Sequence, residues 1–389
     1  MRPGYSSITP DTVHTLARQT LEACLEWKPF RDSVTARDIV DLLLLIAVTG
    51  ASLFAVVRRR FGFSHETGRR AVHSQLASPD AIADGLARSL HHVLAFSRRD
   101  RRRRWIVAID THNCPYYGDR STPGIIGGQK KQGTKYFFGY ATAILIHKRR
   151  RYTVGLISVT PKMKPHEIVT ALLKQIDRHG LSVRGMALDS GFDSGETLLL
   201  LQERGLDYTV PLRRKGRGTN RRNACFAWAS GTVGRLDWVT DKSRKPVSTD
   251  VLVWRRKNQP ETKVYAFSGW GSAEVINVRR RAWLARRRYR ERFGIETSYR
   301  QKNQGKGMTT AKDATYRLLL EGLAHLLRQV WVLLTEQIAR AGRRKPRDWI
   351  GELTLPMMIE WLADVLKNLH PENRSIPLQG DDLRQPSRR

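Results

Sequence analysis

The sequence predicts an α/β fold, in which a mixed sheet flanked by helices follows a helical N-terminal domain and is interrupted by a β-rich insertion. Three observations support it. Apolar residues have helical spacing up to about residue 97, strand-type and helical runs alternate after residue 104, and the helical signal stops between 213 and about 270. With 389 residues, 40% of them hydrophobic, the chain can form more than one domain and a sizeable core.

The N-terminal region, residues 1–100, is predicted to be a helical domain. Thr35–Asp38 resembles a capping box with Asp in place of the usual Glu, and an apolar helical run follows it. Gly50 breaks the run, and Ser64 can cap another helix. Short helices with a glycine-containing break are typical of a helix-turn-helix, and equally of a bundle that only packs. Arg58–Arg60 favours DNA contact, so we regard this domain as possibly DNA-binding.

The central region is predicted to alternate strands and helices. The strands are expected at Trp105–Ile109, Tyr136–Ile146, Tyr152–Val159, Val183–Leu188 and Tyr208–Leu212, with helices at Pro165–His179 and Gly195–Arg204. A turn is expected around Lys148–Arg151, between the second and third strands. The order β-β-β-α-β-α-β is that of an RNase H-like fold, a mixed sheet with helices on both faces. We assign this fold to residues 101–212 and 276–341.

The remaining segments are an insertion and a C-terminal region. Residues 213–275 contain short alternating runs between Gly, Asn, Asp and Pro clusters, which predicts the β-rich insertion. Helices are expected at Arg279–Asn303 and Ala314–Ala341. Within residues 342–389 we expect one more helix at Pro356–Leu369, and we expect the Pro, Gly and Ser-rich tail to be disordered.

The net charge of +33, from 69 Lys and Arg against 36 Asp and Glu, indicates a polyanionic partner. The alternative is a merely solvated basic surface. Clustering favours nucleic acid, because arginine forks match phosphate oxygens. The basic blocks are Arg98–Arg104, Lys148–Arg151, Arg213–Arg222, and Arg279–Arg281 with Arg286–Arg288.

The cysteine count and the apolar runs exclude other classes of protein. Cys24, Cys114 and Cys225 are an odd set without a CxxC pair, so neither a disulfide scaffold nor a Cys/His zinc site is expected. The best apolar run, Ile39–Phe54, is too short and too interrupted to span a bilayer and starts too late for a signal peptide. We expect no membrane partner and a reduced, cytoplasmic setting.

Two aspartates follow predicted strands. Asp110 comes directly after Trp105–Ile109, and Asp189 after Val183–Leu188. A carboxylate in this position points into the crevice where ligands of α/β sheets bind. If the two strands are neighbours, both carboxylates can hold Mg²⁺, which prefers oxygen ligands. Alternatively, either aspartate could be a turn or cap residue that closes its strand.

A third acid, Glu296, lies in a predicted helix. Spacings of three and four residues place Tyr289, Arg292, Glu296, Tyr299 and Arg300 on one face. Such an acid could form a structural ion pair, or it could be the third metal ligand beside the two aspartates. Other polar residues near the acids receive structural interpretations: His112 as a loop histidine, Cys114 as a small buried residue, and Asp193 as the start of a helix.

In combination, these motifs resemble the DDE transposases of bacterial and archaeal insertion sequences, in the large group numbered four. The residues that carry the resemblance are Ile109-Asp110-Thr111, Asp189-Ser-Gly-Phe192, and the Tyr-x₂-Arg-x₃-Glu signature at Tyr289, Arg292 and Glu296. The stretch from Arg292 to Arg300 is similar to the halophile-type subgroup, and the resemblance covers residues 100–340. One departure is at position 303, where Asn replaces the family's Lys; Lys302 and Lys306 lie close by.

The resemblance implies a polynucleotidyl transferase that cuts DNA at the ends of a mobile element and joins those ends to a target. It implies two Mg²⁺ ions, which Mn²⁺ can replace, with Asp110 bridging both, Asp189 binding one and Glu296 the other. Tyr289 and Arg292 would position a phosphate. We add Arg300 and Lys302 to the expected phosphate-binding residues.

The resemblance also implies partners. These are the double-stranded DNA of the terminal inverted repeats and of the target, and a second copy of the chain in a homodimer on DNA, at a prokaryotic nucleoid. In similar enzymes a tryptophan of the insertion stacks on a flipped base; the candidates are Trp238, Trp254 and Trp270, and we choose Trp254. The alternatives are a catalytically inactive or domesticated DNA-binding protein, and an RNase H-like nuclease without strand transfer.

Overall fold

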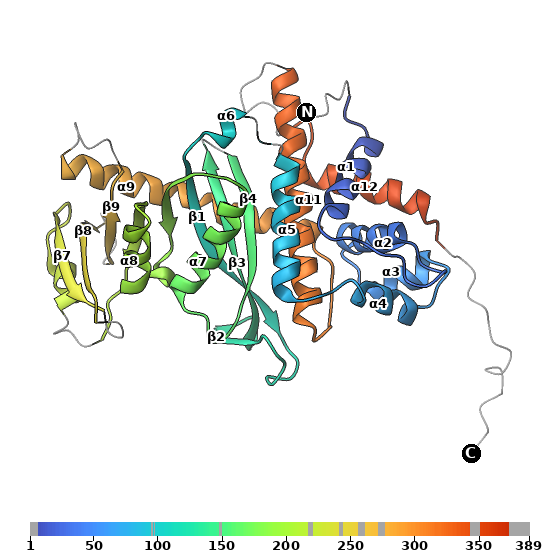
Figure 1. Cartoon of the computed structure of the whole chain (residues 1–389), viewed down its shortest axis with the longest axis horizontal. Helices are drawn as coiled ribbons and strands as arrows, with labels where there is room; N and C mark the ends of the chain where they lie inside the picture. Colours follow the sequence, from blue (N-terminus) through green and yellow to red (C-terminus); the bar gives the residue numbers. More distant parts are fainter. Residues whose placement is uncertain are drawn as a thin grey trace.

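The structure is a computed structural model of the whole chain. It describes residues 7–94, 96, 98–147, 150–216, 221–240, 244–255, 261–270, 277–342 and 351–372. A nine-stranded sheet with its flanking helices forms one end of an elongated molecule, and a group of helices forms the other (Figure 1). The predicted turn at 148–149 and the predicted disordered tail from 373 onward lie outside the described residues.

The N-terminal residues form the predicted helices. These are α1 (Pro10–Glu22), α2 (Ala36–Thr49), α3 (Leu53–Arg60), α4 (His65–His73), α5 (Pro79–Leu94) and the short α6 (Arg98–Arg101). The capping box at the start of α2 is confirmed, since the Thr35 and Asp38 side chains each accept a hydrogen bond from the other's backbone N–H. Gly50 has a φ of 62° and ends α2, after which α3 runs at 115° to it.

The sheet contains parallel and antiparallel strands in the order β2-β3-β1-β5-β6-β9-β8-β7. The ninth strand, β4, is antiparallel to β3 and pairs with its residues 139–147, next to the part of β3 that pairs with β2. The bounds are β1 (Trp105–Tyr116), β2 (Ile126–Lys131), β3 (Thr134–His147), β4 (Arg150–Val159), β5 (Val183–Leu188), β6 (Asp207–Leu212), β7 (Val233–Val239), β8 (Pro246–Arg255) and β9 (Thr262–Ser268). β1 is antiparallel to β3 and parallel to β5, which gives the mixed sheet that the sequence predicts.

Three features of the sheet differ from the expectation. β1 does not end at Ile109 but continues to Tyr116, because residues beyond Asp110 still pair with β3. β2 was not predicted, since this Gly- and Lys-rich segment is mostly exposed and has no apolar alternation. The strands of the β-rich insertion, β7, β8 and β9, extend the central sheet because β9 pairs with β6, a connection that the sequence did not predict.

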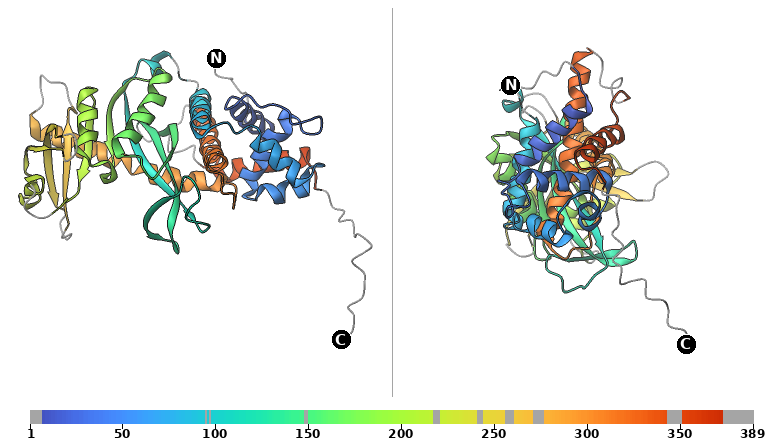
Figure 2. Two further views of the ribbon diagram at one scale, coloured as in Figure 1. Left: turned by 60° about the horizontal axis from the view of Figure 1, so that its bottom comes forward. Right: turned by 90° about the vertical axis from the view of Figure 1, so that its right-hand side faces the viewer.

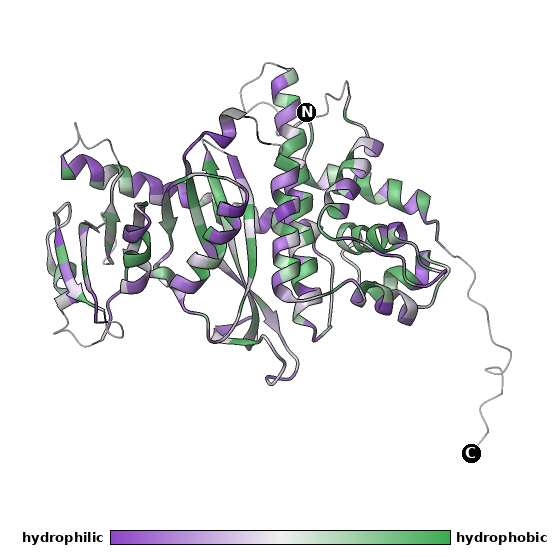
Figure 3. Cartoon of the chain, viewed as in Figure 1, coloured by the Kyte–Doolittle hydropathy of each residue, from purple (hydrophilic) through white to green (hydrophobic). Residues whose placement is uncertain are grey.

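Further helices cover the sheet and connect it to the N-terminal group. They are α7 (Pro165–Arg178), α8 (Gly195–Glu203), α9 (Val278–Arg292), α10 (Gly294–Lys302), α11 (Ala314–Ala341) and α12 (Leu355–Leu369), with 3₁₀ turns at Ser190–Phe192, Arg221–Ala227 and Asn303–Gly305. The expected helix at Arg279–Asn303 is two helices that meet at Phe293. α9 is largely hydrophilic, as its purple ribbon shows (Figure 3).

Helix α11 lies between the sheet and the N-terminal helices, and it packs on α5 and β4 (Figures 1 and 2). α12 returns to pack on α1 and α2. By length and composition α11 could cross a membrane, but its most apolar window is entirely buried within the protein. It therefore has the character of a core helix, and it joins the two ends of the molecule.

Candidate active site

Asp110 and Asp189 occupy neighbouring positions on two parallel strands. Ile109 of β1 pairs with Leu188 of β5, and each aspartate is the next residue along its strand. Adjacent strands lie about 4.8 Å apart, so the backbones of the two aspartates are side by side. Pairing with β5 ends at this point, while β1 continues. The two acids thus lie where the parallel part of the sheet ends.

The third acid reaches the same place through α10. Ile295, the residue before Glu296, is fully buried in an apolar cluster with Ile106 and Ala108 of β1. One helical turn further on, the Tyr299 hydroxyl lies 2.7 Å from Thr142 Oγ1 and donates a 3.2 Å hydrogen bond to the backbone carbonyl of Asp110. These contacts fix α10 against the face of β1 on which Asp110 lies.

The electrostatics of Asp110 reflect the three acids together. Its pKa is raised to about 6, mainly because burial disfavours the charged form. The Arg292 guanidinium opposes this shift, whereas the negative charges of Asp189 and Glu296 add to it. Asp110 is therefore within electrostatic reach of the other two carboxylates as well as of Arg292.

Arg292 is the cation closest to this group. Its Nη1 lies 3.5 Å from Asp110 Oδ2, and its side chain is nearly buried. Burial alone would lower the pKa of Arg292, but Tyr289, to which it is hydrogen-bonded, and Asp110 raise it. Arg292 Nε has no hydrogen-bond partner among the described residues. Arg292 is thus a charged side chain with a free donor at the edge of the acids.

The donor set fits a hard divalent cation. Asp110 lies beside Asp189 across the β1–β5 pair, and both Asp189 and Glu296 act electrostatically on it. Mg²⁺ and Mn²⁺ prefer carboxylate oxygens together with water and phosphate oxygens. Asp110, Asp189 and Glu296 are the residues that would hold such ions.

The other expected DNA-binding residues lie in different environments. Tyr289 is half-buried beside Arg292, and Arg300 is exposed. Trp254 is half-buried on β8, where the Arg286 guanidinium covers its ring at 3.9 Å and the exposed Trp283 meets it edge-on. Of the other two tryptophans considered, Trp238 lies under Arg222, and Trp270 is buried with its indole N–H donated to the Tyr208 carbonyl.

The expectation for Lys302 needs correction. Its side chain is fully buried and its ammonium forms an ion pair with Glu321 of α11. Lys306 binds the same carboxylate at 2.9 Å. Burial alone would raise the pKa of Glu321, but the two lysines hold it well below its usual range. A lysine without exposed surface cannot contact a phosphate, so Lys302 serves to connect α10 with α11.

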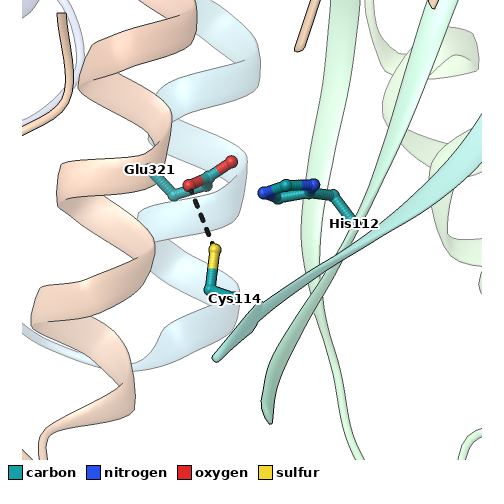
Figure 4. Close-up of side chains that lie close together, drawn as sticks. All are labelled: His112, Cys114 and Glu321. Carbon is teal, nitrogen blue, oxygen red and sulfur yellow. Dashed lines mark hydrogen bonds between the residues drawn. The ribbon is translucent and has the colours of Figure 1, made fainter. Parts of the chain in front are cut away.

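His112 and Cys114 complete this second group of polar residues, which the sequence did not reveal. Both lie on β1 and point toward Glu321 of α11, with Cys114 Sγ 3.8 Å from a carboxylate oxygen (Figure 4). His112 is a strand residue and not the expected loop histidine. Its pKa is lowered to about 4, mainly by burial and to a lesser extent by the positive charge of Lys302. Burial also raises the pKa of the Cys114 thiol, as expected for a small buried residue.

Metal binding by His112, Cys114 and Glu321 is not favoured, although their ligand atoms lie within 4.8 Å of one another. Lys306 Nζ already lies 3.0 Å from Cys114 Sγ and 2.9 Å from Glu321. With Lys302 also present, two ammonium groups face one carboxylate, so the cluster carries excess positive charge. A dication would add to that excess.

A basic cleft adjoins the acids. It has a volume of about 590 Å³ and begins at Ser190, next to Asp189; its other lining residues include Arg213, Arg214, Lys263 and Tyr289. Arg213 Nε donates a 2.9 Å hydrogen bond to Ser190 Oγ. Asp193, expected at a helix start, instead accepts from the Arg213 backbone and forms a buried ion pair with Arg222.

Comparison with known proteins matches the family described as "Transposase DDE domain" over residues 101–307. The chain belongs to this family. Among solved structures, the piggyBac transposase synaptic complex with hairpin DNA is similar, with a TM-score of 0.55 and 13% identity over 98% of this chain and 89% of that chain. No curated protein sequence matches.

Asp110, Asp189 and Glu296 all lie within the matched segment. The likeness to piggyBac transposase, at its low identity, concerns the fold alone, and the mixed sheet flanked by helices is consistent with an RNase H-like transposase fold. Family membership supports a function in DNA transposition, and a polynucleotidyl transferase activity in which divalent metal is the norm.

Proposed function

We propose that this chain is the transposase of an insertion sequence, of the halophile-type subgroup in group four, and that it cleaves DNA at the element ends and transfers the cut strands to a target. The observations that support the proposal are the β1–β5 pairing, which sets Asp110 beside Asp189, and the hydrogen bond from Tyr299 that joins the helix of Glu296 to Asp110. The Asp189-Ser-Gly-Phe element and the Tyr-x₂-Arg-x₃-Glu signature support it.

The acids and the residues around them have separable roles. Two divalent ions, when bound, would supply Lewis-acid stabilisation of the phosphoryl oxygens and lower the pKa of an attacking hydroxyl. Asp110, Asp189 and Glu296 hold those ions. Arg292, whose Nη1 lies 3.5 Å from Asp110 Oδ2, would donate to a non-bridging phosphate oxygen. Tyr289 hydrogen-bonds the same guanidinium and so orients it.

The DNA strand would approach the acids through the basic cleft and along α9. Arg213, Arg214 and Lys263 line the cleft, and α9 contributes exposed arginines such as Arg287 and Arg290. Because each neutralised phosphate releases counterions, these cations favour binding of any DNA sequence. The exposed Trp283, beside Trp254 and Arg286, offers a ring on which a base could stack.

Recognition of the element ends falls to the N-terminal helices in this proposal. α2 and α3 are joined by Gly50-Ala51-Ser52 at 115°, which is the geometry of a helix-turn-helix. α3 buries Val56 and Val57 and exposes Phe54 and Arg58 on its other side. A short helix with this exposed face suits the major groove. We further propose a homodimer, since two ends must be joined, acting in the cytoplasm.

The test is an assay of strand cleavage and joining on labelled duplexes that carry the inverted repeats flanking the gene. Asp110→Asn, Asp189→Asn and Glu296→Gln are expected to retain DNA binding and to lose Mg²⁺-dependent cleavage. Glu26→Gln, at an exposed acid in the loop between α1 and α2, is the matched control and is expected to cleave normally. Full cleavage by any of the three variants would refute the proposal. Cleavage without joining by the unmodified protein would indicate a nuclease instead.

A further inference from the structure

The sheet carries a basic extension beyond the acids. After Asp110, β1 continues for six residues, and the chain then forms a loop, strand β2 and the start of β3; we call residues 117–136 the basic arm. The hairpin of the arm projects from the lower edge of the sheet (Figure 1), while the loop at Gly124 lies against Ala314 at the start of α11. Neither the sequence motifs nor the acidic site explain it.

The basic arm has an ordered structure of its own. Tyr116 pairs with Tyr136, which in turn pairs with Gly127. The Tyr117 hydroxyl donates a 2.8 Å hydrogen bond to the Gln132 carbonyl, although its ring is 71% exposed. The loop is thereby tied to the tip of the hairpin, so the cations of the arm are held on a defined backbone.

The charge of the basic arm is positive and largely uncompensated. It contains Arg120, Lys130, Lys131 and Lys135, all exposed, against the single acid Asp119. The three lysines form no ion pair with any residue that the structure describes. Such a surface is complementary to a polyanion.

Strand β2 is irregular at Gly127, since its register against β3 shifts between Gly127 and Lys131. A glycine inside a strand often marks such a bulge. Beyond it, the outer edge of β2 is exposed. The exposed β2 edge could instead pair with a second copy of the chain, but lysines on an edge strand oppose such pairing.

We propose that the basic arm binds the sugar–phosphate backbone of the duplex whose strand is cleaved at Asp110, which rests on the proposed function. Asp110 pairs with Thr142 and Lys131 with Thr134, so the lysine lies eight residues along β3 from the aspartate, or about 27 Å on an extended strand. At 3.4 Å per base pair, this corresponds to contacts about eight base pairs from the scissile phosphate.

The first measurement is the salt dependence of binding to a 30-base-pair duplex of mixed sequence. Lys130→Ala/Lys131→Ala is expected to reduce the slope of log affinity against log salt by about 1.8, because each phosphate contact contributes about 0.9. The control Lys174→Ala/Lys367→Ala removes two exposed lysines from α7 and α12 and should leave the slope unchanged. An unchanged slope in Lys130→Ala/Lys131→Ala overturns the proposal.

The second measurement is a hydroxyl-radical footprint on a duplex that ends in the flanking inverted repeat. Lys130→Ala/Lys131→Ala should lose protection about eight base pairs from the cleavage point, and circular dichroism should show an unchanged fold. Asp110→Asn should keep this protection while losing cleavage, so failure of the arm and failure of the acidic site are distinguishable. If Lys130→Ala/Lys131→Ala retains this protection, the proposal is wrong. It is also wrong if the variant dissociates a dimer of the protein without changing the salt slope of DNA binding.

Discussion

The Tyr299 hydroxyl donates a hydrogen bond to the backbone carbonyl of Asp110. It joins the helix that carries Glu296 to the strand that carries the first aspartate, and Thr142 on β3 binds the same hydroxyl at 2.7 Å. Because Tyr299 is buried, this hydrogen-bonded connection is shielded from water. The position of Glu296 over the sheet thus depends on a side chain that is not itself one of the acids.

Tyr299→Phe is expected to lower the cleavage rate while leaving DNA affinity unchanged, because α10 loses a polar contact with β1. The free energy of unfolding should fall by about 1 kcal/mol, the usual net value of such a hydrogen bond. Tyr316→Phe is the matched control, since the buried Tyr316 hydroxyl has no partner among the described residues. Equal cleavage by Tyr299→Phe and the control would show that this contact does not position Glu296.

Asp110→Asn is expected to stabilise the protein at pH 7.5 in the presence of EDTA. The pKa of Asp110 is about 6 in the folded protein and 3.8 in the unfolded chain, so ionisation reduces stability as pH rises between these values. The variant should gain about 1–3 kcal/mol at pH 7.5 and little at pH 4, as measured by urea unfolding.

Asp119→Asn is the control, and its effect on the free energy of unfolding should have the opposite sign. Hydrogen bonds from Ser121, of which that of its backbone N–H has the larger effect, hold the pKa of the exposed Asp119 below its usual value. The charged form of Asp119 therefore favours folding. This variant should be less stable than the unmodified protein at pH 7.5, and the difference should shrink as pH falls. A gain for Asp110→Asn that is equal at both pH values would contradict the assignment to this carboxyl group.

Lys302→Met is expected to destabilise the protein by about 3–5 kcal/mol, because it removes one partner of a buried ion pair with Glu321. Lys302→Met/Glu321→Leu should recover part of the loss, since the two fully buried charges are removed while the partly exposed Lys306 loses its carboxylate partner. Urea unfolding measures both values. The salt slope for DNA binding should not change in the double variant; a decrease of about 0.9 would instead indicate that Lys302 contacts a phosphate.

Most of the sheet and two of the acid positions could be predicted from local sequence. The apolar runs before Asp110 and Asp189 define strands, and their parallel pairing brings the acids together. The extent of β1 could not be predicted, because residues 111–116 mix polar and apolar side chains and are strand only through pairing with β3. Glu321 was not predictable either, since its lysine partners come from another element.

The most direct test of the account is a measurement of Mn²⁺ binding in which electron paramagnetic resonance reports the concentration of the free ion. The proteins compared are the unmodified protein, Asp110→Ala, Asp189→Ala and Glu296→Ala, with Glu26→Ala as the control. If the three carboxylates form one metal centre, each of the three variants loses the same binding event and the control retains it. Unchanged Mn²⁺ affinity in any one of the three variants would contradict a shared centre.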